Sequence, residues 1–340
     1  MKILGLSHPV SGCGFHRITL PLGFMDDIDG IVTNYPNEEI LSNKYDIVFY
    51  NRVSPFDKSF EQVRDKLGCK IIVDMDDDWD LPSNHLNYHD YQEMSARIIS
   101  NIRNADMVTC THERLAEKIS KYNKNVQVFP NAIPFGEHQF TEEKEEDEKI
   151  RIFWCGGITH EGDLEIVKNP IRRLKSHKNK IKMILGGYND ENNLSKFIWD
   201  KMFSYFTCSG QLEHEVLKGM TPDKYMEMYK KADIMLIPLL ASDWSANKSN
   251  LKILEASVKS VPVICQAVAP YYDTPDAPVL WVHNQKDWYE HLNFLINNKE
   301  ARIEYGKKIN QWAREKYNLF NVNIARRKAF ANLIAAQTHL

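Results

Sequence analysis

The stretch "NKSNLKILEASVKSVPVI", Asn247–Ile264, joins a polar loop to a helical pattern and then to an apolar run typical of a buried strand. A loop, a helix and a strand in this order form the repeating unit of a parallel α/β sheet. We expect the helix to begin near Lys248 to Leu251, with Asn250 as its N-cap. Free backbone N–H groups at a helix start favour an anion, and Lys248 adds a full positive charge. The segment therefore predicts an anion site at the edge of an α/β sheet.

Glu255 lies about one turn further along the same predicted helix. A carboxylate does not favour a phosphate, but it accepts two hydrogen bonds from the hydroxyls of a ribose. Phosphate at Lys248–Leu251 and ribose at Glu255 describe a bound nucleoside diphosphate. An exposed helix with ordinary capping is the alternative at this point.

Apolar runs separated by helical intervals extend this pattern in both directions. Such alternation predicts a doubly wound parallel sheet in each half of the chain. The runs of the first half are KILGL (2–6), DIVFY (46–50), KIIVD (70–74), DMVTC (106–110) and VQVF (126–129). Those of the second half are RIFWCGG (151–157), KMILGG (182–187), ADIMLIPL (232–239), VPVICQ (261–266) and VLWV (279–282).

The segments between and after these runs divide the chain. GEHQFTEEKEEDEK, residues 136–149, is predicted to be a solvated linker or exposed helix leading into the second half. Beyond about 285 the pattern is helical, with one stripe at Ile309, Trp312, Ala313 and Tyr317 and another at Ala325, Ala329 and Leu333. We therefore predict two tandem Rossmann-like domains at 1–140 and 141–310, and C-terminal helices at 311–340 that are candidates to cross back to the first domain. Ligands of such sheets bind at the carboxyl ends of the strands, so we expect a site in a cleft between the domains.

Composition narrows the class of protein. The 340 residues are 43% hydrophobic and 26% charged, without an apolar run long enough to span a bilayer and without a signal peptide at the start, which predicts a soluble, cytoplasmic protein. Six cysteines without a Cys-x-x-Cys pair indicate reduced thiols and no zinc site. The formal net charge of −3 argues against a uniformly basic nucleic-acid binder. The cluster Arg172 to Lys182 is either a local basic face or a solvated helix surface.

The motif LKILEA (251–256) followed by VPVI (261–264) resembles the donor-binding motif of retaining glycosyltransferases of the GT-B fold, in particular the family 4 group. Four further segments resemble that family in the expected order: SGCGFHRITLPL (11–22), VFPNAI (128–133), FWCGGITHEGDL (153–164) and YKKADIMLIPL (229–239). The resemblance implies an acceptor domain at 1–140 and a nucleotide-sugar domain at 141–310. It also implies that Glu255 holds the ribose of the donor.

The resemblance has departures. Asn247 stands where the family often has a second glutamate that contacts the sugar, and Ser260 stands where glycine is common. The loop near Gly157 lacks the usual arginine and lysine pair, so Thr159 and His160 are candidates to replace it. The expected donor-binding residues are Gly14, Gly157, Thr159, His160, Lys248, Ser249, Asn250, Leu251 and Glu255.

The N-terminal loop SGCGFHR, residues 11–17, carries two glycines that allow a ligand to approach the backbone. Arg17 follows at the start of a helix, and we expect His16 and Arg17 to contact an acceptor. A simple tight turn is the alternative for a lone Gly-x-Gly.

The acidic run DMDDDWDLPS, Asp74–Ser83, follows a predicted strand and should emerge at the same sheet edge. Clustered carboxylates repel one another, so a function or cations must offset the cost. Asp76 and Asp78 are the candidate catalytic residues, and Asp77 is a candidate acceptor contact. They would orient an acceptor hydroxyl, accept its proton or hold a divalent cation. The alternative is a solvated acidic loop with Asp74 as a cap.

The sequence thus predicts a glycosyltransferase that moves a sugar from a nucleotide sugar, expected to be a UDP-sugar, with retention. The Asp-rich loop, SGCGFHR and NKSNLK also resemble enzymes encoded by tailed phages, which implies hydroxymethylcytosine in double-stranded DNA as the acceptor. A cell-surface glycan or lipid-linked sugar, a GT-B-type sugar-nucleotide epimerase and a non-catalytic nucleotide-binding protein are the alternatives. The donor sugar, the metal requirement and the oligomeric state stay open.

Overall fold

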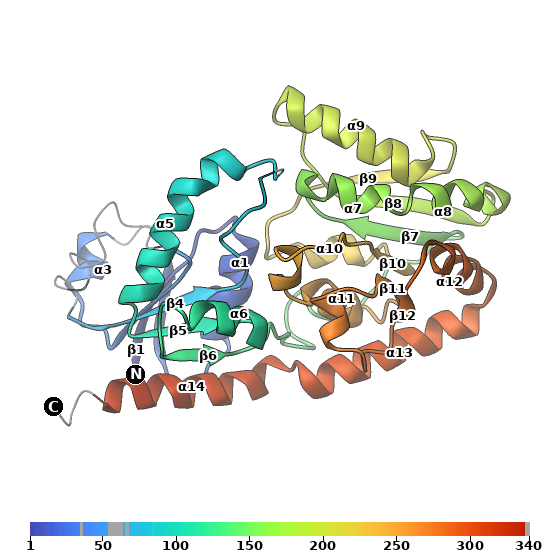
Figure 1. Ribbon diagram of the computed structural model, residues 1–340. Coiled ribbons are helices and arrows are strands. Elements are labelled where there is room, and N and C mark those ends of the chain that lie inside the picture. Colours follow the sequence, from blue (N-terminus) through green and yellow to red (C-terminus); the bar gives the residue numbers. More distant parts are fainter. Residues whose placement is uncertain (35–36, 54–63, 65–67, 84, 337–340) are drawn as a thin grey trace. The chain divides into compact units, whose positions relative to one another are not determined.

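The computed structural model describes residues 1–34, 37–53, 64, 68–83 and 85–336 (Figure 1). The chain divides into two compact units. The first unit comprises Met1–Pro134, Asn247–Ser249 and Tyr317–Leu340, and the second comprises Phe135–Ala246 and Asn250–Lys316. The first three residues of the stretch Asn247–Ile264 thus belong to the first unit, and the rest belong to the second.

The first unit contains a parallel six-stranded sheet in the order β2-β1-β3-β4-β5-β6. Five strands confirm the predicted apolar runs, whereas the edge strand β2 was not predicted. The strand order reverses between β1 and β3, which places a topological switch point at their carboxyl ends. The strands are β1 Lys2–Leu6, β2 Asp29–Thr33, β3 Ile47–Asn51, β4 Lys70–Met75, β5 Met107–Cys110 and β6 Val126–Val128.

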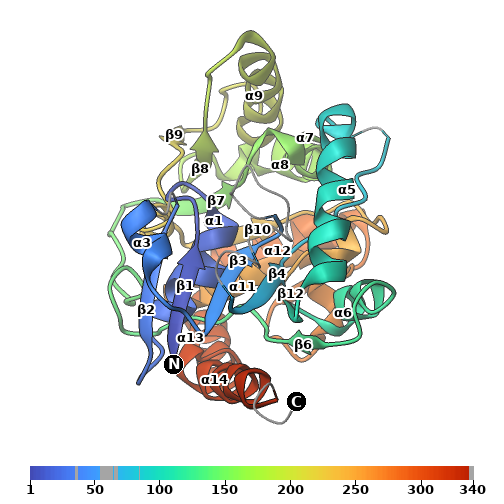
Figure 2. The same ribbon diagram turned by 90° about the vertical axis from the view of Figure 1, so that its left-hand side faces the viewer.

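Helices cover both faces of this sheet (Figure 2). One face packs against α5 (Tyr88–Asn104) and α6 (Glu113–Ile119), and the other packs against α14 (Leu319–Ala335). Phe330 of α14 is fully buried against the ring of Phe49 in β3. The smaller helices are α1 Gly12–Gly14, the π-helix η1 Phe15–Thr19, α2 Leu20–Gly23 and α3 Glu38–Ser42.

The stripe predicted for α14 was partly wrong. Ala325 is exposed, and the fully buried positions of the helix include Asn323, Arg326 and Phe330 instead. Asn323 donates to the backbone carbonyls of Pro21 and Phe24 at 2.9 and 3.0 Å. The apolar pattern of the sequence does not mark this face of the helix, because two of these three buried residues are polar.

The second unit repeats the architecture with a parallel sheet in the order β12-β11-β10-β7-β8-β9. Its switch point lies between β7 and β10. Every predicted run forms a strand, and the edge strand β9 was not predicted. The strands are β7 Ile150–Cys155, β8 Ile181–Tyr188, β9 His214–Lys218, β10 Ile234–Ile237, β11 Val263–Gln266 and β12 Leu280–Val282.

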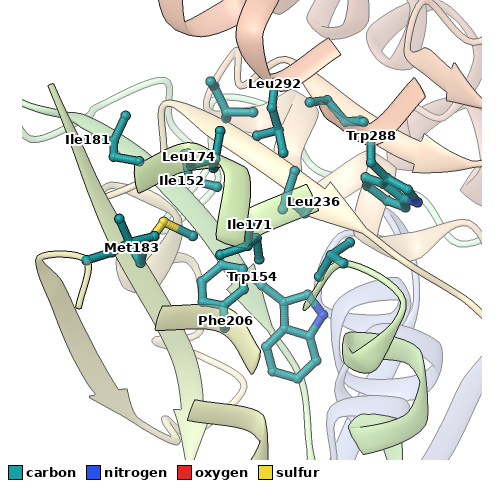
Figure 3. Close-up of a cluster of buried hydrophobic side chains, with 14 of the residues drawn as sticks. Ile152, Trp154, Ile171, Leu174, Ile181, Met183, Phe206, Leu236, Trp288 and Leu292 are labelled. Atoms are coloured by element: carbon teal, nitrogen blue, oxygen red, sulfur yellow. The ribbon is translucent and has the colours of Figure 1, made fainter. Parts of the chain in front are cut away.

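The core of the second unit gathers large side chains from strands and helices, including Trp154 of β7, Phe206 and Trp288 (Figure 3). An apolar stripe at Leu164, Val167, Ile171 and Leu174, spaced by three and four residues, is fully buried there. It runs through α7 (Glu161–Glu165), α8 (Lys168–Arg173) and the 3₁₀ helix η3 (Leu174–His177), and not through one helix. The remaining helices are η2 Ile158–His160, α9 Asn193–Thr207, α10 Met226–Tyr229, η4 Ser245–Asn247, α11 Leu251–Val258, η5 Tyr271–Asp273, α12 Gln285–Asn297 and α13 Lys299–Lys316.

The acidic segment 136–149 is neither an exposed helix nor free of contacts. Its charges pair with cations along the second unit: Glu142 with Arg314 at 2.8 Å, Glu143 with Lys230 at 2.9 Å and Asp147 with Lys182 at 3.6 Å. Each such pair at the surface contributes little by itself. Together they hold the segment along the unit, while most of its residues are exposed to solvent, as predicted. In the described part of the chain, no helix is long and apolar enough to cross a membrane.

Helix α13 passes very close to the turn that ends α11. A Cβ atom on Gly306 would lie 2.0 Å from the backbone oxygen of Ser260. Ser260 itself has a φ of 50°, in the left-handed region that favours glycine. This backbone conformation explains why glycine is common at the position of Ser260 in the resembling family.

We predict that Gly306→Ala destabilises the protein by about 2 kcal/mol or more, because its methyl group meets backbone that has no room to move. The shift of the thermal unfolding midpoint measures this effect. Gly23→Ala is the matched control, since nothing lies within 4 Å of a Cβ there. Equal shifts in the two variants would contradict the close approach.

Candidate functional site

A buried ion pair between Arg17 and Asp74 organises the carboxyl edge of the first sheet. The guanidinium Nε and Nη2 donate to the two carboxylate oxygens of Asp74, each at 2.9 Å, and both side chains are 1% exposed. Nη1 donates to the carbonyl oxygen of Phe129 and to Asn131 Oδ1, and Thr109 donates to Asp74 at 2.6 Å. The structure therefore places Arg17, a predicted acceptor residue, inside the unit with its donors engaged by protein groups.

His16, the other predicted acceptor residue, is 8% exposed. Burial, together with the charge of Arg17, lowers the pKa of His16 to about 4, so the imidazole is neutral at physiological pH. Its neighbour Gly14 is buried as well, and a Cβ there would lie 2.4 Å from Ser7 Oγ. The glycine is thus required by close packing of the loop against β1.

A cavity of about 330 Å³ lies beside this loop at the carboxyl ends of β1 and β3, which is the switch point of the first sheet. Its lining combines polar and apolar groups and consists of Leu6, Ser7, His8, Ser11, Gly14, Asn34, Asn51 and Val53. Hydroxyl, amide and imidazole groups in a cavity of this size suit a small hydroxylated group.

Basic side chains pair with the carboxylates of the acidic run. Asp76 accepts from Arg52 Nε at 3.0 Å and from Asn51 Nδ2 at 2.9 Å. Burial would raise the pKa of Asp76, but the charge and hydrogen bonds of Arg52 outweigh it and hold the pKa well below its usual range. Asp76, a predicted catalytic residue, is thus a fixed anion and a weak base.

Asp78, the second predicted catalytic residue, is 5% exposed and accepts from Lys118 at 2.6 Å and from Asn247 Nδ2 at 2.8 Å. Asp77 is held more loosely. One of its oxygens accepts from the backbone of Asp78 at 2.9 Å, and the other lies 3.5 Å from Lys248 Nζ. Burial raises the pKa of Asp77, which makes it a better proton acceptor than Asp76.

Asn247–Ser249, the start of the predicted donor loop, is fixed by the first unit. His112 Nε2 lies 3.1 Å from the carbonyl oxygen of Asn247, and Asn131 Nδ2 donates to Ser249 Oγ at 2.8 Å. Asn247 is 8% exposed, and its amide donates to Asp78. A glutamate in its place would press a second carboxylate against Asp78, so the aspartate explains why this chain carries an amide where the family often carries an acid.

In the second unit, α11 presents Glu255 near the switch point. Glu255 is 4% exposed and accepts from Tyr229 Oη at 2.6 Å. Burial raises the pKa of Glu255 to about 7, although Tyr229 and the charge of Lys252 oppose the rise. A buried carboxylate with a strongly perturbed pKa at this edge of a sheet is a typical functional group.

Lys252 lies one turn before Glu255 and was not predicted as a site residue. Its Nζ donates to the carbonyl oxygen of Cys155, the last residue of β7, at 2.8 Å and lies 5.3 Å from the ring centre of Trp154. The three-residue spacing from Glu255 puts both side chains on one face of the helix, and this was the signal available in the sequence.

The loop after β7 carries three further predicted donor residues. Gly157 and Thr159 are exposed, and His160 Nδ1 lies 2.6 Å from Asp163 Oδ2. Asp163 also accepts from the backbone of Leu240, which joins this loop to the segment after β10. These residues therefore lie at the switch point of the second sheet.

The predicted start of α11 is also in place. Asn250 occupies the N-cap position, but its side chain makes no capping hydrogen bond, and Leu251 is the first helical residue. Across the described residues, no group of three or more His, Cys, Asp or Glu side chains is arranged to hold a metal ion. All six cysteines are free thiols.

Comparison with solved structures shows the fold. The chain matches HepE from Anabaena, solved in complex with UDP-glucose, with a TM-score of 0.65 and 10% identity, covering 99% of this chain and 100% of that chain. It matches the sucrose-phosphate synthase of Thermosynechococcus elongatus with a TM-score of 0.62 and 12% identity over 86% and 74% of the two chains. The similarity identifies the α/β fold with two Rossmann-like units called GT-B and confirms the predicted fold class.

A further match is a variant of TarM from S. aureus in complex with fondaparinux, α-GlcNAc-glycerol and UDP, with a TM-score of 0.58 and 16% identity. It covers 85% of this chain and 55% of that chain. A scan against protein-family models found no match, and a search of curated proteins found none either.

The hydrogen bond between Asn247 and Asp78 predicts that the acid and the amide can be exchanged between the two positions. Asn247→Asp should lower the free energy of unfolding by about 3 kcal/mol, because it buries a second carboxylate at hydrogen-bond distance from the first. The double variant Asp78→Asn/Asn247→Asp restores one acid opposite one amide and should recover most of that loss. Denaturant unfolding of the two single variants and the double variant measures the coupling, and additive losses would contradict the contact.

The raised pKa of Glu255 predicts a stability that depends on pH. The ordinary pKa is 4.5 and the folded value is about 7, so the folded protein keeps a proton that the unfolded chain loses in this window. Glu255 therefore destabilises the fold increasingly from pH 4.5 to 7 and fully above it. We expect Glu255→Gln to gain up to about 3 kcal/mol of stability relative to wild type between pH 4 and pH 8. A difference that does not change with pH would show that the carboxyl group titrates normally.

Proposed function

We propose that this chain is a nucleotide-sugar-dependent glycosyltransferase that uses a UDP-sugar and retains the anomeric configuration. The observation that carries the proposal is Glu255, a buried carboxylate with a raised pKa on the helix that follows the predicted donor loop. In its ionised form this carboxylate accepts hydrogen bonds from the two hydroxyls of a ribose. The shared fold with HepE, solved with UDP-glucose, supports uridine as the base.

The donor diphosphate is proposed to bind along Lys248, Ser249, Asn250 and Leu251, with Gly157, Thr159 and His160 from the loop after β7 and Gly14 of the N-terminal loop. In the transfer, the acceptor oxygen forms a bond to the anomeric carbon while the bond from that carbon to the diphosphate oxygen breaks. The electron pair leaves with the nucleoside diphosphate, so stabilising its negative charge is the main electrostatic task.

The acceptor is proposed to bind at the edge of the first sheet, where a cavity with hydroxyl, amide and imidazole groups in its lining adjoins the N-terminal loop. Asp77 is the proposed acceptor of the hydroxyl proton, because it is the least firmly held carboxylate of the acidic run. Asp76 and Asp78 are proposed to act by positioning, since they hold Arg52 and Asn247. His16 and Arg17 then support this edge from within.

Hydroxymethylcytosine in double-stranded DNA is the proposed acceptor, supported by the resemblance of SGCGFHR and NKSNLK to phage-encoded enzymes. The basic cluster at 172–182 gives DNA limited support, because Lys182 pairs with Asp147 and Glu215 and the guanidinium of Arg173 stacks on Tyr289. A glycan or polyol acceptor is the second candidate, favoured by the TarM complex with α-GlcNAc-glycerol.

The test offers the protein a panel of nucleotide sugars with hydroxymethylcytosine DNA, unmodified DNA, a polyol glycoside or no acceptor, and measures product masses. We expect sugar addition that requires an acceptor. Glu255→Ala should lower kcat/KM by about 100-fold or more, because the ribose hydroxyls lose a charged partner.

Glu290→Ala removes an exposed glutamate of α12 and is the control, with activity expected to equal wild type. An isomerised sugar nucleotide formed without acceptor would identify an epimerase instead. Nucleotide binding without any turnover would identify a binding protein. Wild-type rates in Glu255→Ala would remove the residue on which the proposal rests.

A further inference from the structure

Lys252 projects from the first turn of α11 toward the carboxyl end of β7. Its ammonium group donates to the carbonyl oxygen of Cys155 at 2.8 Å, directly before Gly156 and Gly157. The side chain is half-buried and lies over the ring of Trp154. A positive charge thus stands at the switch point of the second sheet, on the same helix face as Glu255.

Few other positively charged side chains lie in the segments next to Lys252. The loop GGITHEG, residues 156–162, contains neither lysine nor arginine. Lys248, the cation expected for the diphosphate, lies 3.5 Å from the carboxylate of Asp77. Within the described residues, Lys252 has no carboxylate at ion-pair distance, whereas an ammonium group carries three donors and its contact with Cys155 uses one.

The ammonium group of the half-buried Lys252 has donors left for a further acceptor, either a ligand or a protein group. A purely structural lysine would only satisfy the carbonyl of Cys155 at the end of β7. Lys252 is also placed to bind a phosphate. It lies about one helical turn, roughly 5 Å, from Glu255, so a nucleotide with its ribose on Glu255 could place a phosphate on Lys252.

We propose that Lys252 is the cation that neutralises the diphosphate of the bound nucleotide and replaces the arginine and lysine pair that the loop at Gly157 lacks. This inference rests on the proposed function and adds a binding residue to it. The ammonium group leaves the carbonyl of Cys155 or shares it with a phosphate oxygen. When the glycosidic bond to the diphosphate breaks, the same charge stabilises the departing oxygen.

Calorimetric titration separates the phosphate contact from the rest of the nucleotide. The probes are the diphosphate that wild type binds best among UDP, GDP, ADP and TDP, and the nucleoside of the same base. Lys252→Met should weaken diphosphate binding by about 10- to 100-fold, because a charge-assisted hydrogen bond is lost, and leave nucleoside binding unchanged. Lys252→Arg keeps the charge and should retain most of the affinity.

Lys286→Met, at an exposed position of α12, is the matched control and should bind both probes like wild type. Equal diphosphate affinity in Lys252→Met and wild type would overturn the inference while leaving the proposed function intact. Equal losses for diphosphate and nucleoside would also overturn it, since they show a structural role. If wild type binds none of the four diphosphates, the proposed function fails together with the inference.

Discussion

The buried pair of Arg17 and Asp74 is the interaction on which the edge of the first sheet depends. Two charges at 1% exposure are costly to bury, and they are tolerated only when geometry and further hydrogen bonds compensate. Here the two groups also engage Thr109, the carbonyl of Phe129 and Asn131. Asn131 in turn holds Ser249, so the pair connects the N-terminal glycine loop with the segment that precedes α11.

The same edge shows how five close carboxylates coexist. Arg17, Arg52 and Lys248 pair with Asp74, Asp76 and Asp77, and Lys118 pairs with both Asp78 and Asp80. Through these ion pairs the aspartates hold basic side chains in place along this edge of the sheet. In the second unit Glu255 differs from these aspartates. It is buried beside Tyr229, which is a neutral hydrogen-bond donor, and burial raises the pKa of Glu255. A group that costs stability in this way is expected where binding chemistry requires it.

Much of the fold followed from the sequence because buried parallel strands are continuous apolar runs. The two strands that were missed, β2 and β9, lie at sheet edges and carry exposed residues such as Asp29 and His214. Asn250 was placed at the start of α11 from spacing. The partner of Arg17 was out of reach, because Asp74 is 57 residues away and only the tertiary fold brings them together. Lys252 was overlooked although its spacing from Glu255 was visible.

The proposed function requires a nucleoside diphosphate at the start of α11 and the loop after β7. A crystal structure with bound UDP would show whether it binds there. We expect the ribose hydroxyls on the carboxylate of Glu255 and a phosphate oxygen within hydrogen-bond distance of Lys252. A nucleotide bound elsewhere, with Glu255 still accepting from Tyr229 and making no contact with the ribose, would contradict this placement.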